Sequence, residues 1–467
     1  MSVTIEAPAP AAVRQDESRP LTGNEAIARG AWEAGVRVAA AYPGTPSTEI
    51  LENLATYPRE DLHAQWSTNE KVALDVAIGA GLGGRRALAA MKHVGLNVAF
   101  DSLMSQTYIG VNGALVLTVA DDPGIHSSQN EQDTRLLGAF AMLPVLEPSD
   151  AQEALEYTRL AFELSERFDT PVIVRTTTRL SHTRSAVRTG TRREGPVRQF
   201  VENPAKNVMI PAHARGRHHA LLKREAALSA WLDDEPLHRV ERGQGDLGRV
   251  GIVTAGTCYP YVREVLPGAS VLKLGASWPL PARALREFAA SVDRLLVVEE
   301  LEPVLERELR LLGLQVEGKA FFPRTGELSP EAVRAGLEKA GVLAPRPPRA
   351  DGWAPEPLVR PPGESLLRTL MNIAFMLALY YGNAKLLVNR YLETGRYREL
   401  IVYLLIFWLG AAALRTWVEL STFGGNVFVA RTGVQPGWLR MFVVYSISSF
   451  LLLLFSTLYH LVANRHA

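Results

Sequence analysis

Cysteine is almost absent from this chain, since Cys258 is its single cysteine among 467 residues. One thiol cannot build an internal disulfide framework, and it cannot replace the four thiolates that hold an iron–sulfur cluster. An excess of one charge is missing too, because 50 Lys and Arg residues balance 49 Asp and Glu residues. The composition therefore excludes a cluster held by this chain's own cysteines. The charge balance gives no reason to expect a nucleic-acid partner.

A secretory leader and a metal-binding cluster are also not evident. The first 20 residues are polar and rich in Ala and Pro, which is typical of a flexible arm and not of a signal peptide. We therefore expect the polar part of the chain to lie in the cytoplasm. His213, His218 and His219 fall in an Arg-rich stretch, where a solvated basic face or a connector is the more common reason for such spacing. We predict no metal ligands on this chain.

The pattern of apolar residues predicts two α/β domains with mostly parallel sheets. In the first, residues 21–185, helical patterns alternate with short apolar runs of strand length. Such alternation is typical of a parallel sheet flanked by helices. The same pattern starts again over residues 249–343, which predicts a second, smaller domain. The more polar residues 186–248 are interpreted as a connector, and the Pro- and Arg-rich residues 344–364 as a linker.

Three polar loops each follow a predicted strand of the first domain. Their sequences are YPGTPSTE, KHVGLN and DDPGIHSSQNEQD. Taken singly, each loop also fits ordinary turn chemistry, because Gly, Pro, Asn and Asp favour turns. However, the carboxyl ends of parallel strands meet at one edge of a sheet, and ligands bind there. Their common position therefore favours a binding site.

These loops carry a family resemblance. The chain resembles the alpha subunit of indolepyruvate ferredoxin oxidoreductase, within the thiamine-diphosphate-dependent 2-oxoacid:ferredoxin oxidoreductases. The resemblance covers about residues 20–345. It implies a thiamine pyrimidine-binding domain at 21–185 and a domain like the transketolase C-terminal domain at 249–343. The matching segments are GNEAIARGAWEAGV, AAYPGTPSTEILE, WSTNEKVALDVAIGAGLGG, AMKHVGLNVAFD, VADDPGIHSSQNEQDTR, LPVLEPSD, GIVTAGTCYPYV, LKLGASWPLP and VVEELEP.

The resemblance also implies roles for individual residues. Glu70 would protonate the ring nitrogen of the aminopyrimidine, although a carboxylate at a helix start also suits the helix dipole. His93 and His126 are further catalytic candidates, because imidazole titrates near neutral pH, and either could instead be structural. The cofactor-binding candidates are Gly44, Thr45, Pro46, Glu70 and Asn97. The substrate-binding candidates are Thr45, Ser47 and Arg135.

The family pattern stops after the second domain. No Gly-Asp-Gly magnesium motif and no cysteine follow residue 345. The resemblance therefore implies a thiamine diphosphate site shared with a partner chain, which would also supply magnesium and an iron–sulfur cluster. The expected partners are a beta-type oxidoreductase subunit and a chain carrying the diphosphate-binding and ferredoxin modules. The assembly would be a homodimer or a hetero-oligomer.

The C-terminal residues 365–467 differ in character and read as a hydrophobic helical segment. Apolar stretches occur at 370–381, 400–414 and 441–463, and the third contains no Asp, Glu, Lys or Arg. A bilayer core requires roughly 20 apolar residues per helix, so two or three transmembrane helices are expected. The two shorter stretches also suit buried or interfacial helices. This interpretation adds membrane lipid as a partner and places the protein at the cytoplasmic face of the cell membrane.

Together these observations give one leading hypothesis. The chain would be a membrane-tethered alpha-type component of a 2-oxoacid:ferredoxin oxidoreductase that oxidatively decarboxylates aryl 2-oxoacids such as indolepyruvate. Two alternatives stay open at this point. One is a non-catalytic, membrane-bound assembly or regulatory protein that keeps the fold, and the other is a truncated, fused gene product.

Overall fold

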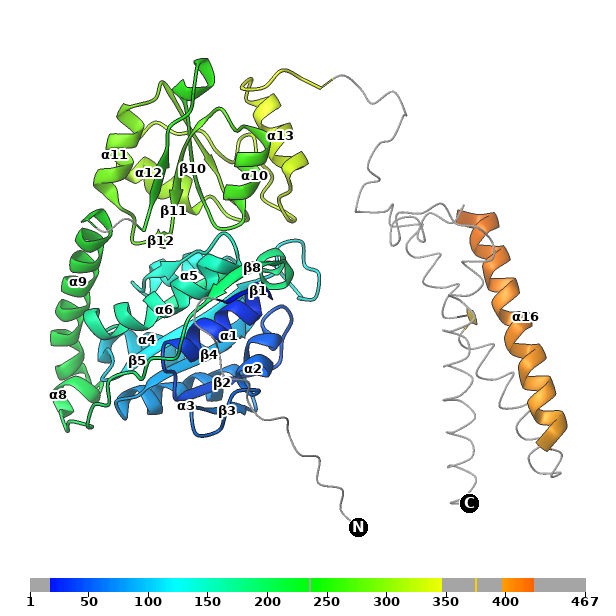
Figure 1. The fold of residues 1–467 in the computed structure, drawn as a ribbon, viewed down its shortest axis with the longest axis horizontal. Helices are drawn as coiled ribbons and strands as arrows, with labels where there is room; N and C mark the ends of the chain where they lie inside the picture. Colours follow the sequence, from blue (N-terminus) through cyan, green and yellow to red (C-terminus); the bar gives the residue numbers. More distant parts are fainter. Residues whose placement is uncertain (1–16, 235–236, 347–373, 376–396, 424–467) are drawn as a thin grey trace, which may run out of the picture. The chain divides into compact units, whose positions relative to one another are not determined.

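The structure is a computed structural model that describes residues 17–234, 237–346, 374–375 and 397–423. The chain divides into two units, Met1–Pro345 and Arg346–Ala467. The first unit contains two large sheets with helices around them and a two-stranded ribbon, and the second contributes one described helix (Figure 1). The predicted α/β class with mostly parallel sheets is confirmed.

A seven-stranded sheet forms the first half of unit one. Its strand order is β12-β6-β7-β5-β4-β2-β3. Every pairing from β6 to β3 is parallel, and β12 adds an antiparallel edge. The strands are β2 (Val38–Ala41), β3 (His63–Trp66), β4 (Arg86–Lys92), β5 (Ala114–Asp121), β6 (Val145–Leu146), β7 (Val172–Thr177) and β12 (Ala276–Trp278).

Helices cover both faces of this sheet because its central strands are apolar on both sides. In β4, Leu88 and Ala90 pack into one core cluster, whereas Ala87, Ala89 and Met91 pack into the other. Adjacent residues of a strand point to opposite faces, so one continuous apolar run supplies two cores. The helices are α1 (Gly23–Glu33), α2 (Thr48–Leu54), α3 (Glu70–Leu82), α4 (His93–Ile109), α5 (Thr134–Phe140), α6 (Ala151–Phe168) and α7 (Thr178–His182).

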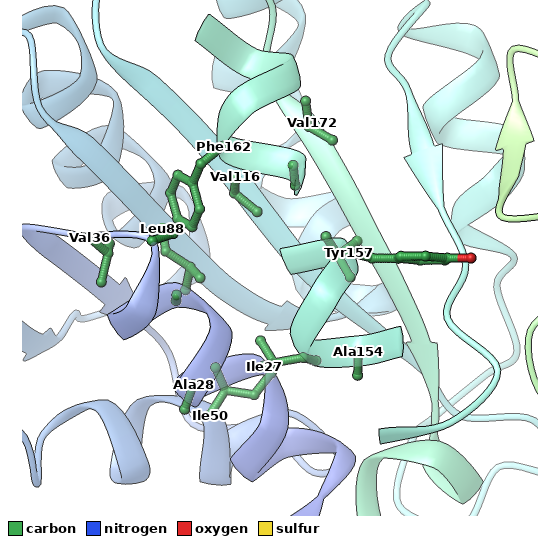
Figure 2. Packing of buried hydrophobic residues seen from close by; sticks show 14 of the residues in the cluster. Ile27, Ala28, Val36, Ile50, Leu88, Val116, Ala154, Tyr157, Phe162 and Val172 are labelled. Atoms are coloured by element: carbon green, nitrogen blue, oxygen red, sulfur yellow. The ribbon is translucent and has the colours of Figure 1, made fainter. Parts of the chain in front are cut away.

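The first core cluster joins α1, α2 and α6 to the sheet. Figure 2 shows Phe162 of α6 near Leu88 and Val116 of the central strands, with Ile27 of α1 packed in the same cluster. The second cluster holds α3 and α4 on the opposite face, and Leu74 and Leu96 are among its buried residues. The second cluster therefore fixes α3 and α4, whose starts carry several of the candidate residues.

A second sheet of four strands follows, with the order β13-β10-β11-β9. Its three long strands are parallel, and β9 is antiparallel to β11. Its strands are β9 (Arg239–Glu241), β10 (Val250–Ala255), β11 (Ser270–Leu274) and β13 (Arg294–Val298). Its helices are α10 (Cys258–Val265), α11 (Ala282–Ala290), α12 (Val304–Leu311) and α13 (Pro330–Lys339).

The sheets do not follow the expected boundaries strand by strand. A short antiparallel ribbon pairs β1 (Glu17–Thr22) with β8 (Arg184–Thr189), so residues 17–20 already belong to a strand. The stretch expected to be a connector contributes β9 to the second sheet, besides α8 (Pro204–Asn207), the long helix α9 (Pro211–Asp234) and the 3₁₀ helix η1 (Asp246–Arg249). In return β12, from the second domain's stretch of sequence, pairs with the first sheet. The boundaries at 20, 185, 248, 343 and 364 stay predictions.

The predicted location at a membrane is wrong. Among the described residues, no helix is both long enough and apolar enough to cross a bilayer. The second unit's described helix, α16 (Tyr397–Phe423), contains the apolar stretch 400–414 for which a transmembrane helix was one expectation. Its uncharged run lies between Glu399 and Arg415 and is shorter than the roughly 20 residues that a bilayer core requires. The expected stretch 441–463 lies outside the described residues, as does 370–381 apart from 374–375.

Candidate functional site

The first turn of α4 lies at the centre of the candidate site. Glu70 opens α3, where the Asn69 side chain caps the helix by accepting from the Val72 amide at 2.9 Å. The half-buried Glu70 side chain lies against Gly95 of α4. A β-carbon placed on Gly95 would be 2.5 Å from Glu70 Cγ and 2.6 Å from its Oε1, so only glycine leaves room for this carboxylate. The arrangement brings the start of α3 and the start of α4 together.

His93 connects the same turn to the loop between β5 and α5. The ring is fully buried, and its Nε2 lies 3.0 Å from the carbonyl oxygen of Asn130. Because a carbonyl only accepts, the Nε2–H group donates this hydrogen bond. Within the described part of the chain, Nδ1 is buried without a hydrogen-bond partner. His93 therefore fixes the loop and leaves its second ring nitrogen unpaired among the described residues.

Hydrogen bonds hold the backbone of the loop after β2 in place. Ser47 Oγ donates to the Gly44 carbonyl at 2.9 Å, and Asn24 Nδ2 donates to the Pro46 carbonyl at 2.7 Å. Pro46 and Ser47 are buried as a result, whereas Thr45 is exposed. The Thr45 carbonyl accepts from Ser127 Oγ at 3.0 Å, which joins this loop to the one after β5. The backbone of the loop is thus fixed from both sides.

The loop after β5 is organised by Asp122. Its carboxylate accepts from the Ser127 amide at 2.8 Å and from Thr178 Oγ1 at 2.8 Å. Burial alone would oppose ionisation, but hydrogen bonds from Ser127, Ser128 and Thr178 outweigh it and hold the pKa of Asp122 below its usual range. His126 in this loop is exposed, and its Nε2 lies 3.8 Å from Glu327 of the second domain.

The structure brings most of the expected residues to the ends of neighbouring parallel strands. The loops or helix starts that follow β2, β3, β4 and β5 carry Gly44, Thr45, Pro46, Ser47, Glu70, His93, Asn97 and His126. Asn97 is exposed one turn into α4. Their individual roles stay predictions, since position alone does not assign a function.

Arg135 lies apart from this group. It is buried in α5, where its Nε and Nη2 pair with both carboxylate oxygens of Asp133 at 2.9 and 2.6 Å. Its Nη1 donates to Glu299 at 2.8 Å, and Nη2 also donates to the carbonyls of Glu300 and Glu302. Burial opposes the charge, but the Asp133 and Glu299 carboxylates raise the pKa of Arg135. The structure thus uses this guanidinium to join the two α/β domains.

Sequence reasoning missed Lys92, the last residue of β4. Its side-chain carbons lie 3.4–3.5 Å from the position that a β-carbon on Gly44 would occupy. Its ammonium donates to the Ser127 carbonyl at 3.1 Å and to Ser128 Oγ at 3.2 Å. The available signal was its place in KHVGLN, directly before His93 at the end of a predicted strand.

Comparison with known proteins finds related sequences. Residues 29–220 match the family described as pyruvate flavodoxin/ferredoxin oxidoreductase, thiamine diphosphate-binding. The chain is 44% identical to the indolepyruvate oxidoreductase subunit IorA of Archaeoglobus fulgidus over 70% of its own length and 54% of that protein. Its identity to IorA of Pyrococcus abyssi is also 44%, over 70% of this chain and 53% of that one. This chain therefore spans about half the length of these relatives.

A solved structure shows the same fold. The 2-oxoglutarate:ferredoxin oxidoreductase from Magnetococcus marinus, with 2-oxoglutarate, coenzyme A and succinyl-CoA bound, aligns with a TM-score of 0.56 and 18% identity. The alignment covers 72% of this chain and 68% of that one. The resemblance predicted from the sequence is confirmed: the chain is similar to the IorA subunits of indolepyruvate oxidoreductase over about 70% of its length, and its residues 29–220 match the pyruvate flavodoxin/ferredoxin oxidoreductase, thiamine diphosphate-binding family.

Proposed function

We propose that this chain contributes the aminopyrimidine half of a thiamine diphosphate site in a 2-oxoacid oxidoreductase. The observation that carries the proposal is the contact between Glu70 and Gly95. A carboxylate lies in a space that any larger residue than glycine would fill, at the strand ends of a domain in the matching family. The donor set fits the cofactor, because a carboxylate is the group that holds a proton against a ring nitrogen.

The chain's own residues would bind, orient and hold protons. Bound thiamine diphosphate supplies a nucleophilic carbon that adds to the 2-oxo group of a substrate. Glu70 would hold the proton at the aminopyrimidine nitrogen, while the fixed Gly44–Pro46 backbone and Asn97 would position the ring. Thr45 would present its hydroxyl to the substrate. His93 and His126 are the candidates for moving protons near the reacting atoms.

Other chains would supply the remaining chemistry. Among the described residues there is no group of His, Cys, Asp and Glu able to hold a metal ion. Magnesium, the diphosphate contacts and an iron–sulfur path would therefore come from a chain with diphosphate-binding and ferredoxin modules and from a beta-type subunit. By similarity to the IorA subunits, the reaction would be oxidative decarboxylation of an aryl 2-oxoacid such as indolepyruvate to its acyl-CoA.

In this proposal the two α/β domains keep the roles that the sequence predicts for them. Residues 21–185 would form the pyrimidine-binding domain and 249–343 the second domain. Residues 186–248 would be the connector between them. A flexible arm of 20 residues would precede the first domain, and a linker at 344–364 would follow the second. The ion pair between Arg135 and Glu299 across the two domains supports treating them as one working unit.

The test is the variant Glu70→Gln in the native complex purified with its partner chains. Gln keeps the size of the side chain but cannot ionise, so we expect oxoacid-dependent electron transfer to fall about 100-fold or more. Glu52→Gln on α2 is the matched control, because Glu52 is an exposed carboxylate away from these loops. A normal rate in Glu70→Gln would remove Glu70 from the mechanism. A wild-type complex that never turns over any aryl 2-oxoacid would contradict the proposed function itself.

A further inference from the structure

Lys92 holds a positive charge at the junction of two site loops without an acidic partner. Its carbons pack beside Gly44 of the loop after β2, and its ammonium contacts Ser127 and Ser128 of the loop after β5. No carboxylate among the described residues lies within 4.0 Å of its Nζ. A lysine ammonium has three N–H donors, and two of them are used by these contacts. One donor and the whole charge are therefore left for a ligand.

Two other cations of the first α/β domain, which could compete for an anionic ligand, are already paired with carboxylates. Lys71, next to Glu70 on α3, pairs with Asp101 at 2.6 Å. Arg135, which the sequence suggested as a substrate ligand, is buried against Asp133 and Glu299. Lys92 differs from both, because within the described ranges its ammonium donates hydrogen bonds to a carbonyl and a hydroxyl oxygen and forms no ion pair. These oxygens position the ammonium without cancelling its charge.

The site needs a cation if its ligand is an acid. The Glu70 carboxylate stands against the first turn of α4, which begins one residue after Lys92. A substrate carboxylate entering beside Glu70 would be repelled unless a positive charge lay on its other side. The start of α4 adds the positive end of a helix dipole to that of Lys92. Both features favour an anion at this position over a neutral group of the same shape.

We propose that Lys92 binds the carboxylate of the 2-oxoacid substrate. This inference rests on the proposed function and names the group that distinguishes an acid from a neutral ketone. The carbonyl of Thr45 in the neighbouring loop accepts from Ser127 Oγ, so the exposed Thr45 belongs to the same junction of loops as Lys92. Lys92 is thus a specificity-determining residue, and its loss weakens binding of acids while sparing neutral analogues.

The experiment compares an acid with its uncharged analogue. Phenylpyruvate and phenylacetone are titrated calorimetrically into the native complex depleted of thiamine diphosphate, so that no carbon nucleophile consumes the acid while its binding is measured. The variants are Lys92→Met, Lys92→Arg and the control Lys71→Met. We expect the wild type to prefer phenylpyruvate by about 10- to 100-fold, the size of one charge-assisted contact. Lys92→Met should reduce that preference to near one, whereas Lys92→Arg and Lys71→Met should keep most of it.

The outcomes separate this inference from the proposed function. If Lys92→Met keeps the full preference for the acid, Lys92 only clamps the two loops and the inference is overturned. A loss of melting temperature without a change in preference would lead to the same conclusion. If the wild type shows no preference, the inference also fails, and turnover by the wild type against Glu70→Gln then decides whether the thiamine function stands. Retained preference in Lys92→Arg shows that the charge is the feature recognised.

Discussion

Replacing Gly95 by alanine tests the Glu70 carboxylate without changing any polar group. The new methyl carbon would lie 2.5 Å from Glu70 Cγ and 2.6 Å from Oε1. Carbon and oxygen atoms normally approach to about 3.5 Å, so the carboxylate has to retreat by about 1 Å. Glu70 is half-buried at the start of its helix, and its side chain has room to turn away. The substitution therefore moves the carboxylate and leaves the backbone in place.

The stability and the activity should respond in different ways. Alanine is better than glycine in a helix by about 0.5–1 kcal/mol, and this gain offsets the cost of turning Glu70. We expect the free energy of unfolding to change by less than about 1 kcal/mol. Catalysis is less tolerant, because a misplacement of about 1 Å at a reacting group lowers a rate about 100-fold. Gly95→Ala should therefore lose about two orders of magnitude in turnover while it stays folded.

Gly79→Ala is the matched control for the helix effect. A β-carbon on Gly79, in the middle of α3, would meet no atom within 4 Å. This variant should gain the same helix stability and keep full activity. The assay is oxoacid-dependent reduction of an electron acceptor by the native complex, with thermal unfolding recorded for the same samples. Wild-type turnover in Gly95→Ala would refute the reasoning, because the carboxylate would then not need the position seen here.

Two further predictions concern the boundary between the α/β domains. Burial raises the pKa of Glu300 to about 7 from its ordinary 4.5, and its Oε1 accepts from the Leu328 amide. The folded protein binds this proton more tightly, so its contribution to stability is full below about pH 4.5 and is lost as the pH rises to about 7. The free energy of unfolding should fall by about 3 kcal/mol over this range. Glu300→Gln should abolish this dependence on pH, which is measured from denaturant midpoints between pH 5 and 8. If the variant keeps the same dependence on pH as the wild type, Glu300 is not its source. Arg135→Met should cost about 3–5 kcal/mol in unfolding free energy, because Glu299 loses its partner in the interior. The exposed Arg324→Met should cost under about 1 kcal/mol, and equal losses in the two variants would show that the Arg135 network is not special.

The sequence alone determined the local elements of this protein. Short apolar runs predicted a mostly parallel sheet within residues 21–185, and the strands observed there include Val38–Ala41, Arg86–Lys92 and Ala114–Asp121. Such runs can be read locally because each residue of a doubly covered strand is buried on one face or the other. The family resemblance was equally readable, since its motifs are continuous segments of chain. Glu70 at a helix start followed from both kinds of signal.

The tertiary structure alone decided which side chains meet. Arg135 has the sequence context of a loop ligand, yet its partner Glu299 lies 164 residues away, and no local pattern encodes that pairing. Lys92 stands beside Gly44 only because parallel pairing puts β4 next to β2. The exchange of β9 and β12 between the sheets likewise depends on which edges lie free in space. The spacing of apolar residues along a helix or strand shows whether a residue faces the core. Which charged residues pair across different elements depends on distances that only the folded chain sets.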